Sequence, residues 1–158
     1  MKNYLSRVVA TACIIASIVT SAGAATPVDH SNLFDAKSSI IPYASAYLSD
    51  YSISIGTRGN CRIVITMDVN AVRTVDKLGC LMLVIDQKID GVWSTYDVLF
   101  GIENPDFYMY NTASYLGGYS FYGTAGVQYR ATMTAYAQDS TGYDTGEELT
   151  SHVVTCSE

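Results

Sequence analysis

The residue types that most often carry out catalysis are scarce in this chain and far apart. Its only histidines are His30 and His152, so a Ser-His-Asp or Cys-His arrangement needs one of them beside a nucleophile. No G-x-S-x-G, H-E-x-x-H or phosphate-loop motif occurs. The triplet Asp144-Thr145-Gly146 matches the aspartic protease signature by letter, but it follows Gly142-Tyr143 instead of a buried apolar run. We therefore expect no enzyme and no cofactor.

Four carboxylates gather in one short segment near the C-terminus. Oxygen ligands on a flexible loop can hold Ca²⁺ weakly, although the spacing here is not that of an EF-hand. The alternative is a solvated hairpin turn whose charges keep a sheet edge soluble. Both interpretations stay open for Asp139, Asp144, Glu147 and Glu148.

Aromatic residues are the one feature that indicates a ligand. The chain has 13 tyrosines, and several lie close together in "NPDFYMYNTASYLGGYSFYG". Rings on a sheet face or loop stack on sugars or anchor a protein partner, because they offer a large apolar area with few rotatable bonds. In a strand, however, alternation buries about half of such residues in the core. The candidate ligand-binding residues are Phe107, Tyr108, Tyr110, Tyr115, Tyr119 and Tyr122.

The N-terminus is typical of a secretory signal peptide. Lys2 and Arg7 precede the uncharged run "VVATACIIASIVTSAGA", which ends in the small residues Ala22, Gly23 and Ala24. We predict cleavage after Ala24, so that residues 1–24 are removed; a retained membrane anchor is the alternative. Cys13 lies too early in the apolar run to become a lipidated first residue. A secreted or cell-surface protein, with no membrane contact after cleavage, follows from this reading.

The charge balance argues against polyanionic partners. Removing residues 1–24 takes away Lys2 and Arg7, which leaves 7 of the 9 basic residues against all 15 acidic ones, a formal balance of −8. Such a surface repels nucleic acid and anionic headgroups, and no cluster of Lys or Arg provides a local exception. We expect no nucleic acid as a partner, and the sequence indicates no oligomeric state.

Hydrophobic patterning predicts one β domain. Residues 25–47 carry Pro27 and Pro42 without a sustained period, so we expect a lead-in segment that is partly flexible. The domain spans residues 48–158, a length that supports a single core. Period-two alternation and turn residues predict strands near 48–55, 61–69, 78–88, 92–100, 115–123, 127–137 and 148–156.

Two details refine this expectation. The run from Cys80 to Ile85 is apolar at nearly every position, which suits a central strand covered on both faces. Asp90-Gly91 supplies the positive φ angles that a tight hairpin requires. About seven short strands with frequent turns are the signature of an antiparallel, immunoglobulin-like sandwich.

The stretch "YGTAGVQYRATMTAYAQDSTG" resembles the sixth strand and following loop of fibronectin type III domains. The resemblance implies that Tyr129 forms a tyrosine corner, with its hydroxyl bonded to the preceding turn. Ala131 stands where antibody domains have cysteine, and Trp93 follows the Asp90-Gly91 turn as a surface or edge residue, so the chain departs from true immunoglobulins. As a whole it also resembles small, exported, Tyr- and Ser-rich single-domain proteins of Gram-positive bacteria that lack an assigned function.

Three cysteines follow the predicted cleavage site: Cys61, Cys80 and Cys156. Three pairings are possible, and no C-x-x-C motif indicates a redox or zinc site. In the strand order of a sandwich, the second strand begins and the seventh ends at the same end of the domain. That order predicts a Cys61–Cys156 disulfide, whereas in the alternative all three thiols are reduced.

The sequence therefore predicts a secreted, non-catalytic binding or adhesion module for a glycan or an extracellular protein. A structural protein that self-associates at the cell surface or in a matrix is the second interpretation. An extracellular hydrolase is the third.

Overall fold

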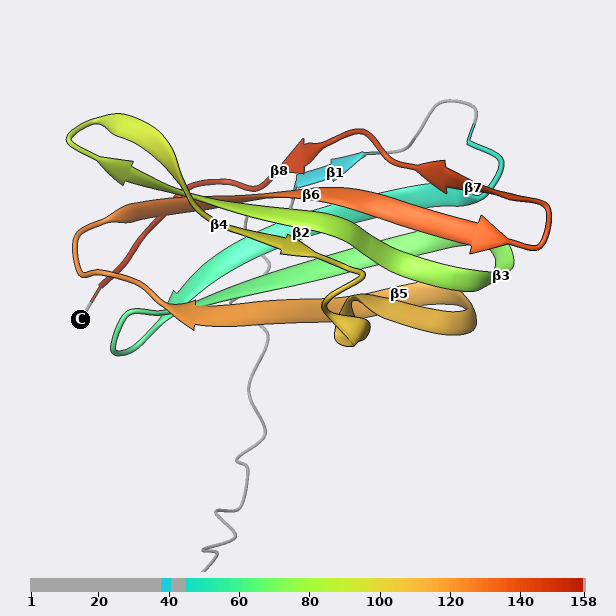
Figure 1. The fold of residues 1–158 in the computed structure, drawn as a ribbon. Helices are drawn as coiled ribbons and strands as arrows, with labels where there is room; N and C mark the ends of the chain where they lie inside the picture. Colours follow the sequence, from blue (N-terminus) through green and yellow to red (C-terminus); the bar gives the residue numbers. More distant parts are fainter. Residues whose placement is uncertain (1–37, 41–44, 158) are drawn as a thin grey trace, which may run out of the picture.

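The chain folds as an antiparallel β-sheet (Figure 1). The structure, a computed structural model, describes residues 38–40 and 45–157. Within them the sole helix is a single 3-10 turn, η1 (Pro105–Phe107). The all-β prediction is confirmed, with strands β1 (Ser38–Ile40), β2 (Leu48–Arg58), β3 (Arg62–Ile89), β4 (Val92–Phe100), β5 (Tyr108–Tyr122), β6 (Gln128–Asp139), β7 (Gly142–Thr145), β8 (Leu149–Thr150) and β9 (Val154–Thr155).

Strand β3 organises the molecule because it pairs with four others. Its first part, up to Asn70, pairs with β2 on one side and β5 on the other. Its last part, from Met82, pairs with β4 and β6. The sequence predicted two separate strands here with a connection through the seventies. That expectation is wrong: β3 runs unbroken for 28 residues, because pairing with β5 resumes at Val75 after a register shift.

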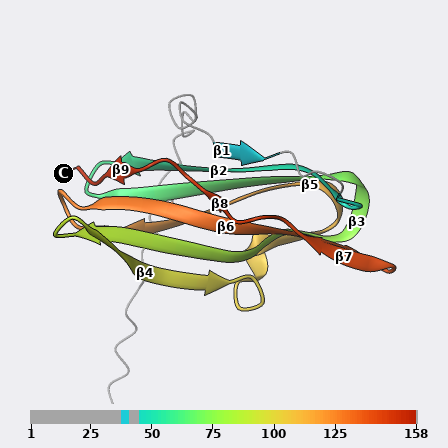
Figure 2. The same ribbon diagram turned by 90° about the horizontal axis from the view of Figure 1, so that it is seen from above.

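Alternating residues build one core from both parts of the sheet. Every second residue over Tyr51–Ile55, Ile63–Val69 and Tyr129–Ala137 is almost fully buried, and these side chains belong to a single hydrophobic cluster. Strands β2 and β6 contact each other without being paired. Figure 2 shows the elements from a second direction. Buried core residues include Tyr51, Ile53, Ile55, Ile63, Ile65, Met67, Leu83, Ile85, Tyr129, Ala131, Met133 and Ala135.

The hairpin between β3 and β4 forms as the sequence predicts. Asp90 and Gly91 have φ angles of 51° and 81°, and Ile89 pairs with Val92 directly across the two-residue turn. Trp93 lies on β4 and is partly exposed, with the Arg130 guanidinium 4.4 Å from the centre of its ring system. Trp93 is therefore no core residue.

Only one face of the apolar run in β3 is covered. Cys80, Leu83 and Ile85 are buried, but Leu81 is exposed, and Met82 and Val84 are half-buried. The expectation of a strand covered on both faces is therefore wrong. The second face is apolar because Met82 and Val84 pair there with Phe100 and Val98 of β4, which are exposed themselves.

The described part of the lead-in is fastened to the sheet. Residues 38–40 form β1 against β2, and residues 45–47 bind a single carboxylate of β7. One oxygen of Asp144 accepts hydrogen bonds from the Ser45 hydroxyl at 2.6 Å and from the N–H groups of Ala46 and Tyr47 at 2.8 and 3.0 Å. The predicted signal peptide and the remainder of the lead-in lie outside the described residues.

Candidate functional site

The structure separates the six aromatic residues that the sequence singled out. Phe107, Tyr108 and Tyr115 are buried, and Tyr119 is half-buried beside the core. The Tyr115 hydroxyl donates to the carbonyl of Asp106 at 3.2 Å, which holds the η1 turn against β5. Only Tyr110 and Tyr122 are strongly exposed, and they lie near opposite ends of β5. These six residues therefore do not form one surface.

A different set of aromatic residues does come together, around Lys77. The Lys77 Nζ lies 3.7 Å from the ring centroid of Tyr108 and 5.6 Å from that of Tyr136. The rings of Tyr136 and Tyr143 stack with centroids 6.0 Å apart. Tyr110 pairs directly with Lys77 across β3 and β5. We call Lys77, Tyr108, Tyr110, Tyr136 and Tyr143 the tyrosine–lysine platform.

Backbone register explains why these residues meet. Gly79 pairs with Tyr108 on one side and with Tyr136 on the other, so the two rings flank a residue without a side chain. A Cβ atom on Gly79 would collide with the carbonyl oxygen of Phe107. A Cβ atom on Gly101 would collide with the Tyr108 hydroxyl. Glycine at both positions therefore makes room for Tyr108 beside Lys77.

Burial affects the titration of two phenols of the platform, those of Tyr108 and Tyr136. Burial, followed by the neighbouring Cys80, Tyr136 and Tyr110, raises the pKa of Tyr108 to about 12. Burial also raises the pKa of Tyr136, with Tyr143 as a further cause. The Lys77 ammonium lies against the electron-rich faces of two rings, a cation–π arrangement. The platform thus presents hydroxyl donors and open ring faces, without a nucleophile paired to a base.

The platform has one exposed end on each side. Tyr110 is 62% exposed and Tyr143 is 66% exposed, whereas Tyr108 is 7% exposed. Tyr110 and Tyr143 are thus the members of the platform that solvent reaches most, whereas Tyr108 is buried and Lys77 and Tyr136 are half-buried. Large, rigid amphipathic rings arranged in this way are typical of binding surfaces.

The structure does not bring the four carboxylates of the acidic segment together. Asp139 forms an ion pair with Arg73 at 2.8 Å and accepts hydrogen bonds from Thr141, and these contacts hold its pKa below the ordinary value. Asp144 instead binds residues 45–47, while Glu147 and Glu148 are exposed. Among residues 38–40 and 45–157, no group of three or more His, Cys, Asp or Glu side chains could hold a metal ion. Asp139 and Asp144, two of the four candidate calcium ligands, are therefore engaged in contacts within the protein.

The remaining chemically suggestive residues are also dispersed. His152 lies between β8 and β9, and its buried Nδ1 has no hydrogen-bond partner. The neighbouring Ser151 hydroxyl accepts the Ala131 N–H at 3.0 Å and donates to the His152 carbonyl at 2.8 Å. Both hydrogen bonds of the Ser151 hydroxyl are therefore made with backbone groups. His30 lies outside the described residues.

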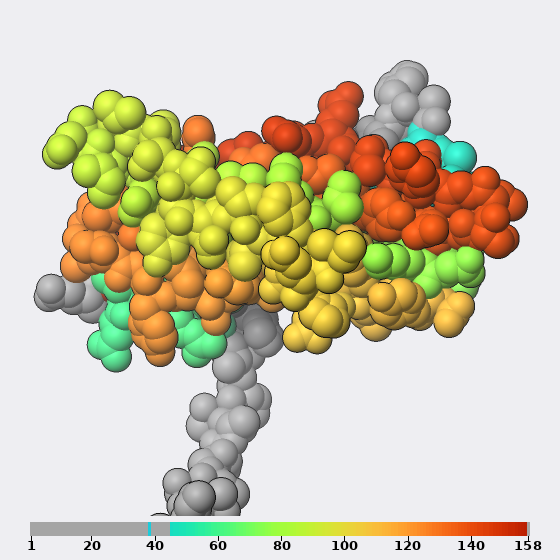
Figure 3. Space-filling model, viewed as in Figure 1, coloured from blue at the N-terminus to red at the C-terminus, as the bar shows by residue number. Residues whose placement is uncertain are grey.

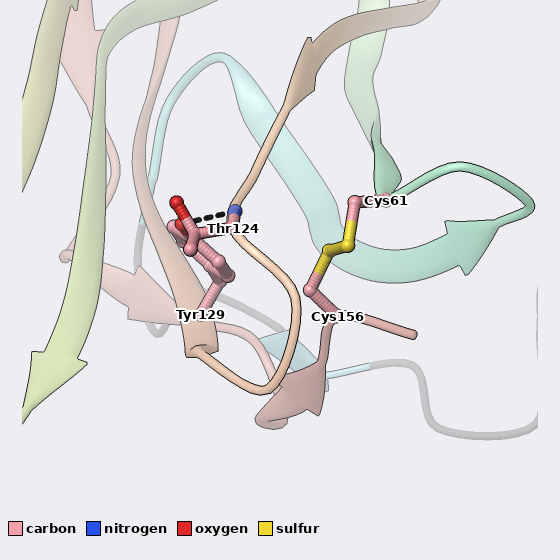
Figure 4. The surroundings of a disulfide bond; sticks show 4 residues. All are labelled: Cys61, Thr124, Tyr129 and Cys156. Carbon is pink, nitrogen blue, oxygen red and sulfur yellow. Dashed lines mark hydrogen bonds between the residues drawn. A yellow bond between two sulfur atoms is a disulfide. The ribbon is translucent and has the colours of Figure 1, made fainter. Parts of the chain in front are cut away.

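The disulfide forms between the predicted cysteines. Cys61 and Cys156 are bridged, with Cα atoms 5.1 Å apart and 95 positions between them in sequence (Figure 4). Cys80 stays free and buried, and its thiol donates to the Met82 carbonyl at 3.2 Å. The bridge ties the start of β3 to the last residues of the chain.

Tyr129 lies near the disulfide, at the start of β6. Its ring is fully buried, and its hydroxyl accepts the Thr124 N–H at 3.0 Å (Figure 4). This contact joins the strand to the turn that precedes it. Phe121 and Tyr96 pack edge-on against the ring, with centroids 5.5 and 5.8 Å away.

Sequence reasoning did not identify Lys77, Tyr136 and Tyr143. The signal for Tyr136 was present, because it is out of phase with the buried alternation of Tyr129, Ala131 and Met133. Tyr143 pairs with Gln138 across the β6–β7 hairpin, so its place depends on a register that only the turn fixes. Lys77 gave no signal, since its contacts depend on how β3 and β5 pair after their register shift.

Comparison with protein-family models, curated proteins and solved structures found no match to this chain. No helix in the described part of the chain is long and apolar enough to span a membrane.

Proposed function

We propose that this protein is a secreted, non-catalytic binding module and that its ligand binds on the tyrosine–lysine platform. The observation that carries the proposal is the convergence of Tyr108 and Tyr136 on Lys77, with Tyr110 and Tyr143 exposed beside them. Core tyrosines have their ring faces covered. Tyr110 and Tyr143 are strongly exposed, and although one face of Tyr143 stacks on Tyr136, a ligand can stack on the ring surface that solvent reaches.

The ligand class that fits best is a neutral glycan. Phenol rings stack on the apolar C–H faces of sugars, and the protonated phenols together with Lys77 supply hydrogen-bond donors to sugar hydroxyls. The chain carries a formal charge of −6, which disfavours acidic glycans at long range. An extracellular protein is the alternative ligand, since exposed tyrosines also anchor protein interfaces.

A fibronectin type III-like sandwich is the proposed architecture of this module. Support comes from the pairing order, in which β1, β2, the first part of β3 and β5 form one group of neighbours. A second group consists of the last part of β3 with β4 and β6, and of β6 with β7, β8 and β9. The shared core and the Tyr129–Thr124 bond fit two packed sheets with a tyrosine corner.

Secretion is proposed from the N-terminal sequence and is supported by the disulfide. Lys2 and Arg7 precede an apolar run that ends in small residues, as in signal peptides. The Cys61–Cys156 bridge is of a kind that persists mainly in oxidising compartments.

Binding should be tested first on a glycan array and then by solution titration with a soluble oligosaccharide from the strongest hit. Tyr110→Ala and Tyr143→Ala should each weaken binding about tenfold, since each removes a stacking ring worth roughly 1–2 kcal/mol. Tyr122→Ala is the matched control, because Tyr122 is 69% exposed and lies at the far end of β5. Titration per chain with a single-site ligand excludes any effect of avidity.

Two results would contradict the proposal. One is an array without any hit at high protein concentration. The other is an equal loss of affinity in Tyr122→Ala, which would mean that the rings act anywhere on the surface and not as a platform. Array hits confined to protein ligands, lost on Tyr143→Ala, would keep the site and replace the ligand class.

A further inference from the structure

Strand β5 offers a long, uncharged and unpaired sheet edge. Within residues 38–40 and 45–157, β3 is the only strand that pairs with β5. The 15 residues of β5 contain no charged residue and no proline, two of the devices that keep an edge from pairing with other chains. Figure 3 shows β5, in orange, along the lower rim of the molecule. The other strand that pairs only with β3 is β4, which carries Asp97 and a bulge at Tyr96.

The free peptide groups of β5 can be identified from one hydrogen bond. The N–H of Gly123 donates to the carbonyl of Cys61 at 2.9 Å, so odd-numbered residues direct their backbone groups toward β3. Because these groups alternate along an antiparallel strand, even-numbered residues direct theirs toward the open edge. At Ser114 the Thr112 hydroxyl bonds both the N–H and the carbonyl. The edge that remains open consists of the exposed residues Leu116, Gly118, Ser120 and Tyr122.

We propose that two copies of this chain pair antiparallel along β5, about a two-fold axis at Tyr119. In this register Leu116 faces Tyr122 of the second copy, and Gly118 faces Ser120. Each open peptide group then meets an open peptide group of the second copy. A shift in one direction would place an open group against Ser114, whose peptide groups are already bonded to Thr112. A shift in the other direction would place an open group beyond Tyr122, where the strand ends. The edge is therefore complementary to itself.

The same register covers the two most exposed large hydrophobic side chains of the strand. Leu116 is 67% exposed and Tyr122 is 69% exposed, and the axis places each beside the other from the second copy. An aromatic ring opposite an aliphatic side chain is a favourable cross-strand pair. Two such pairs form, one on each side of the axis.

Charges next to β5 are compatible with this pairing. Arg62 lies beside Tyr122, and Asp68 lies beside Leu116, in the register of β3 and β5. Across the interface, the paired side chains follow the order Arg62 and Tyr122 of one copy, then Leu116 and Asp68 of the other. Each such row therefore has a positive charge at one end and a negative charge at the other. Although the chain as a whole is acidic, no like charges meet in these rows. Because the two-fold contact uses the same edge on both copies, assembly closes at a dimer.

The test is the mass and dissociation constant of the purified protein by analytical ultracentrifugation. The wild-type protein should sediment as a concentration-dependent dimer. Leu116→Lys combined with Tyr122→Lys places lysines opposite each other and should raise the dissociation constant at least about a hundredfold. Leu116→Lys combined with Tyr122→Glu places opposite charges in the same positions and should restore it to within about tenfold of the wild-type value.

Matched controls separate this edge from general surface effects. Val92→Lys changes an apolar residue of equal exposure, 67%, on the other strand that pairs only with β3, and should leave the dimer intact. Circular dichroism and melting temperatures that match those of the wild-type protein, measured at concentrations below its dimer dissociation constant, show that the double variants fold. Amide exchange at Leu116, Gly118, Ser120 and Tyr122 should slow as the dimer forms.

Several outcomes overturn the inference. It fails if the wild-type protein stays monomeric at every concentration, or if the Lys–Lys variant dimerises as well as the wild type does. A Lys–Glu variant that remains monomeric refutes the register. Oligomers that grow beyond the dimer, or that are lost in Val92→Lys, assign association to a different edge.

Discussion

The backbone N–H of Thr124 donates to the buried hydroxyl of Tyr129 across five positions of sequence. The bond closes the turn between β5 and β6, where the chain passes from a strand beside the first part of β3 to one beside its last part. The Tyr129 ring is fully buried between Phe121 and Tyr96, so it cannot rotate to another partner without opening the core. Together with the Val127 N–H to Thr124 carbonyl bond at 3.1 Å, this contact holds the chain reversal.

Tyr129→Phe should lower the free energy of unfolding by about 1–2 kcal/mol, because it leaves the Thr124 N–H without its partner while the ring packing stays. Urea unfolding at neutral pH measures the difference. Tyr122→Phe, at a 69% exposed position, should change it by less than about 0.5 kcal/mol. Equal free energies of unfolding for Tyr129→Phe and the wild-type protein would mean that the hydrogen bond does not stabilise the fold.

Removal of the disulfide by Cys61→Ser and Cys156→Ser together should destabilise the protein by roughly 4 kcal/mol, as expected for a closed loop of this length. The two residues are 95 positions apart, so the bridge strongly restricts the unfolded chain. Thermal unfolding of the wild-type protein with and without a reductant is an independent check. A melting temperature insensitive to both treatments would contradict this expectation.

Acid should release residues 45–47 from β7. Hydrogen bonds from Ser45, Tyr47 and Ala46 lower the pKa of Asp144 below its ordinary value of 3.8. A carboxyl whose pKa is lowered by folding contributes stability above its unfolded pKa and loses that contribution as the pH falls through its folded pKa. Asp144→Asn should therefore cost about 1 kcal/mol at pH 7, a value reduced for solvent exposure, and nothing once the wild-type carboxyl is protonated. Unfolding curves of both proteins across this pH range measure the difference, and a constant gap would argue against the linkage.

Cys80 should resist alkylation in the native protein. Burial raises the pKa of its thiol to about 12, partly offset by backbone hydrogen bonds, so almost no thiolate exists at pH 8. Iodoacetamide labelling followed by peptide mapping should show Cys80 unmodified in buffer and fully modified in denaturant. Rapid native labelling would mean that the second part of β3 opens readily.

Period-two patterning predicted most of the fold, because burial of alternate residues leaves a direct trace in the sequence. Ile63, Ile65 and Met67 form an apolar stripe that alternation alone reveals. Asp90-Gly91 predicts a turn because both residues have the positive φ angles that a tight hairpin requires. The continuity of β3 was not predictable in this way. Residues 70–77 lack a stripe, and of this stretch Asn70, Val75 and Lys77 pair with β5, across a register shift and more than thirty positions away in sequence.

The platform was harder to predict than the core. Runs of tyrosine looked like a surface, yet Tyr115 is buried by alternation and Phe107 by the η1 turn. The ring partner of Tyr108 is Tyr136 of β6, which in turn stacks on Tyr143 of β7, and nothing local in sequence connects these residues to Tyr108. Alternation along a strand predicts which face of the sheet a side chain lies on. Which side chains of different strands lie close together depends on the register between strands that are distant in sequence.

Strand β3, which takes part in every major strand pairing, also determines how the protein unfolds. β3 belongs to both groups of strands and curls round at one end of the molecule to pass from one group to the other (Figure 1). Detaching either group would leave half of this backbone without partners. Melting is therefore expected to be all-or-none, and a partly opened form that exposes only one side of the core is not an accessible intermediate.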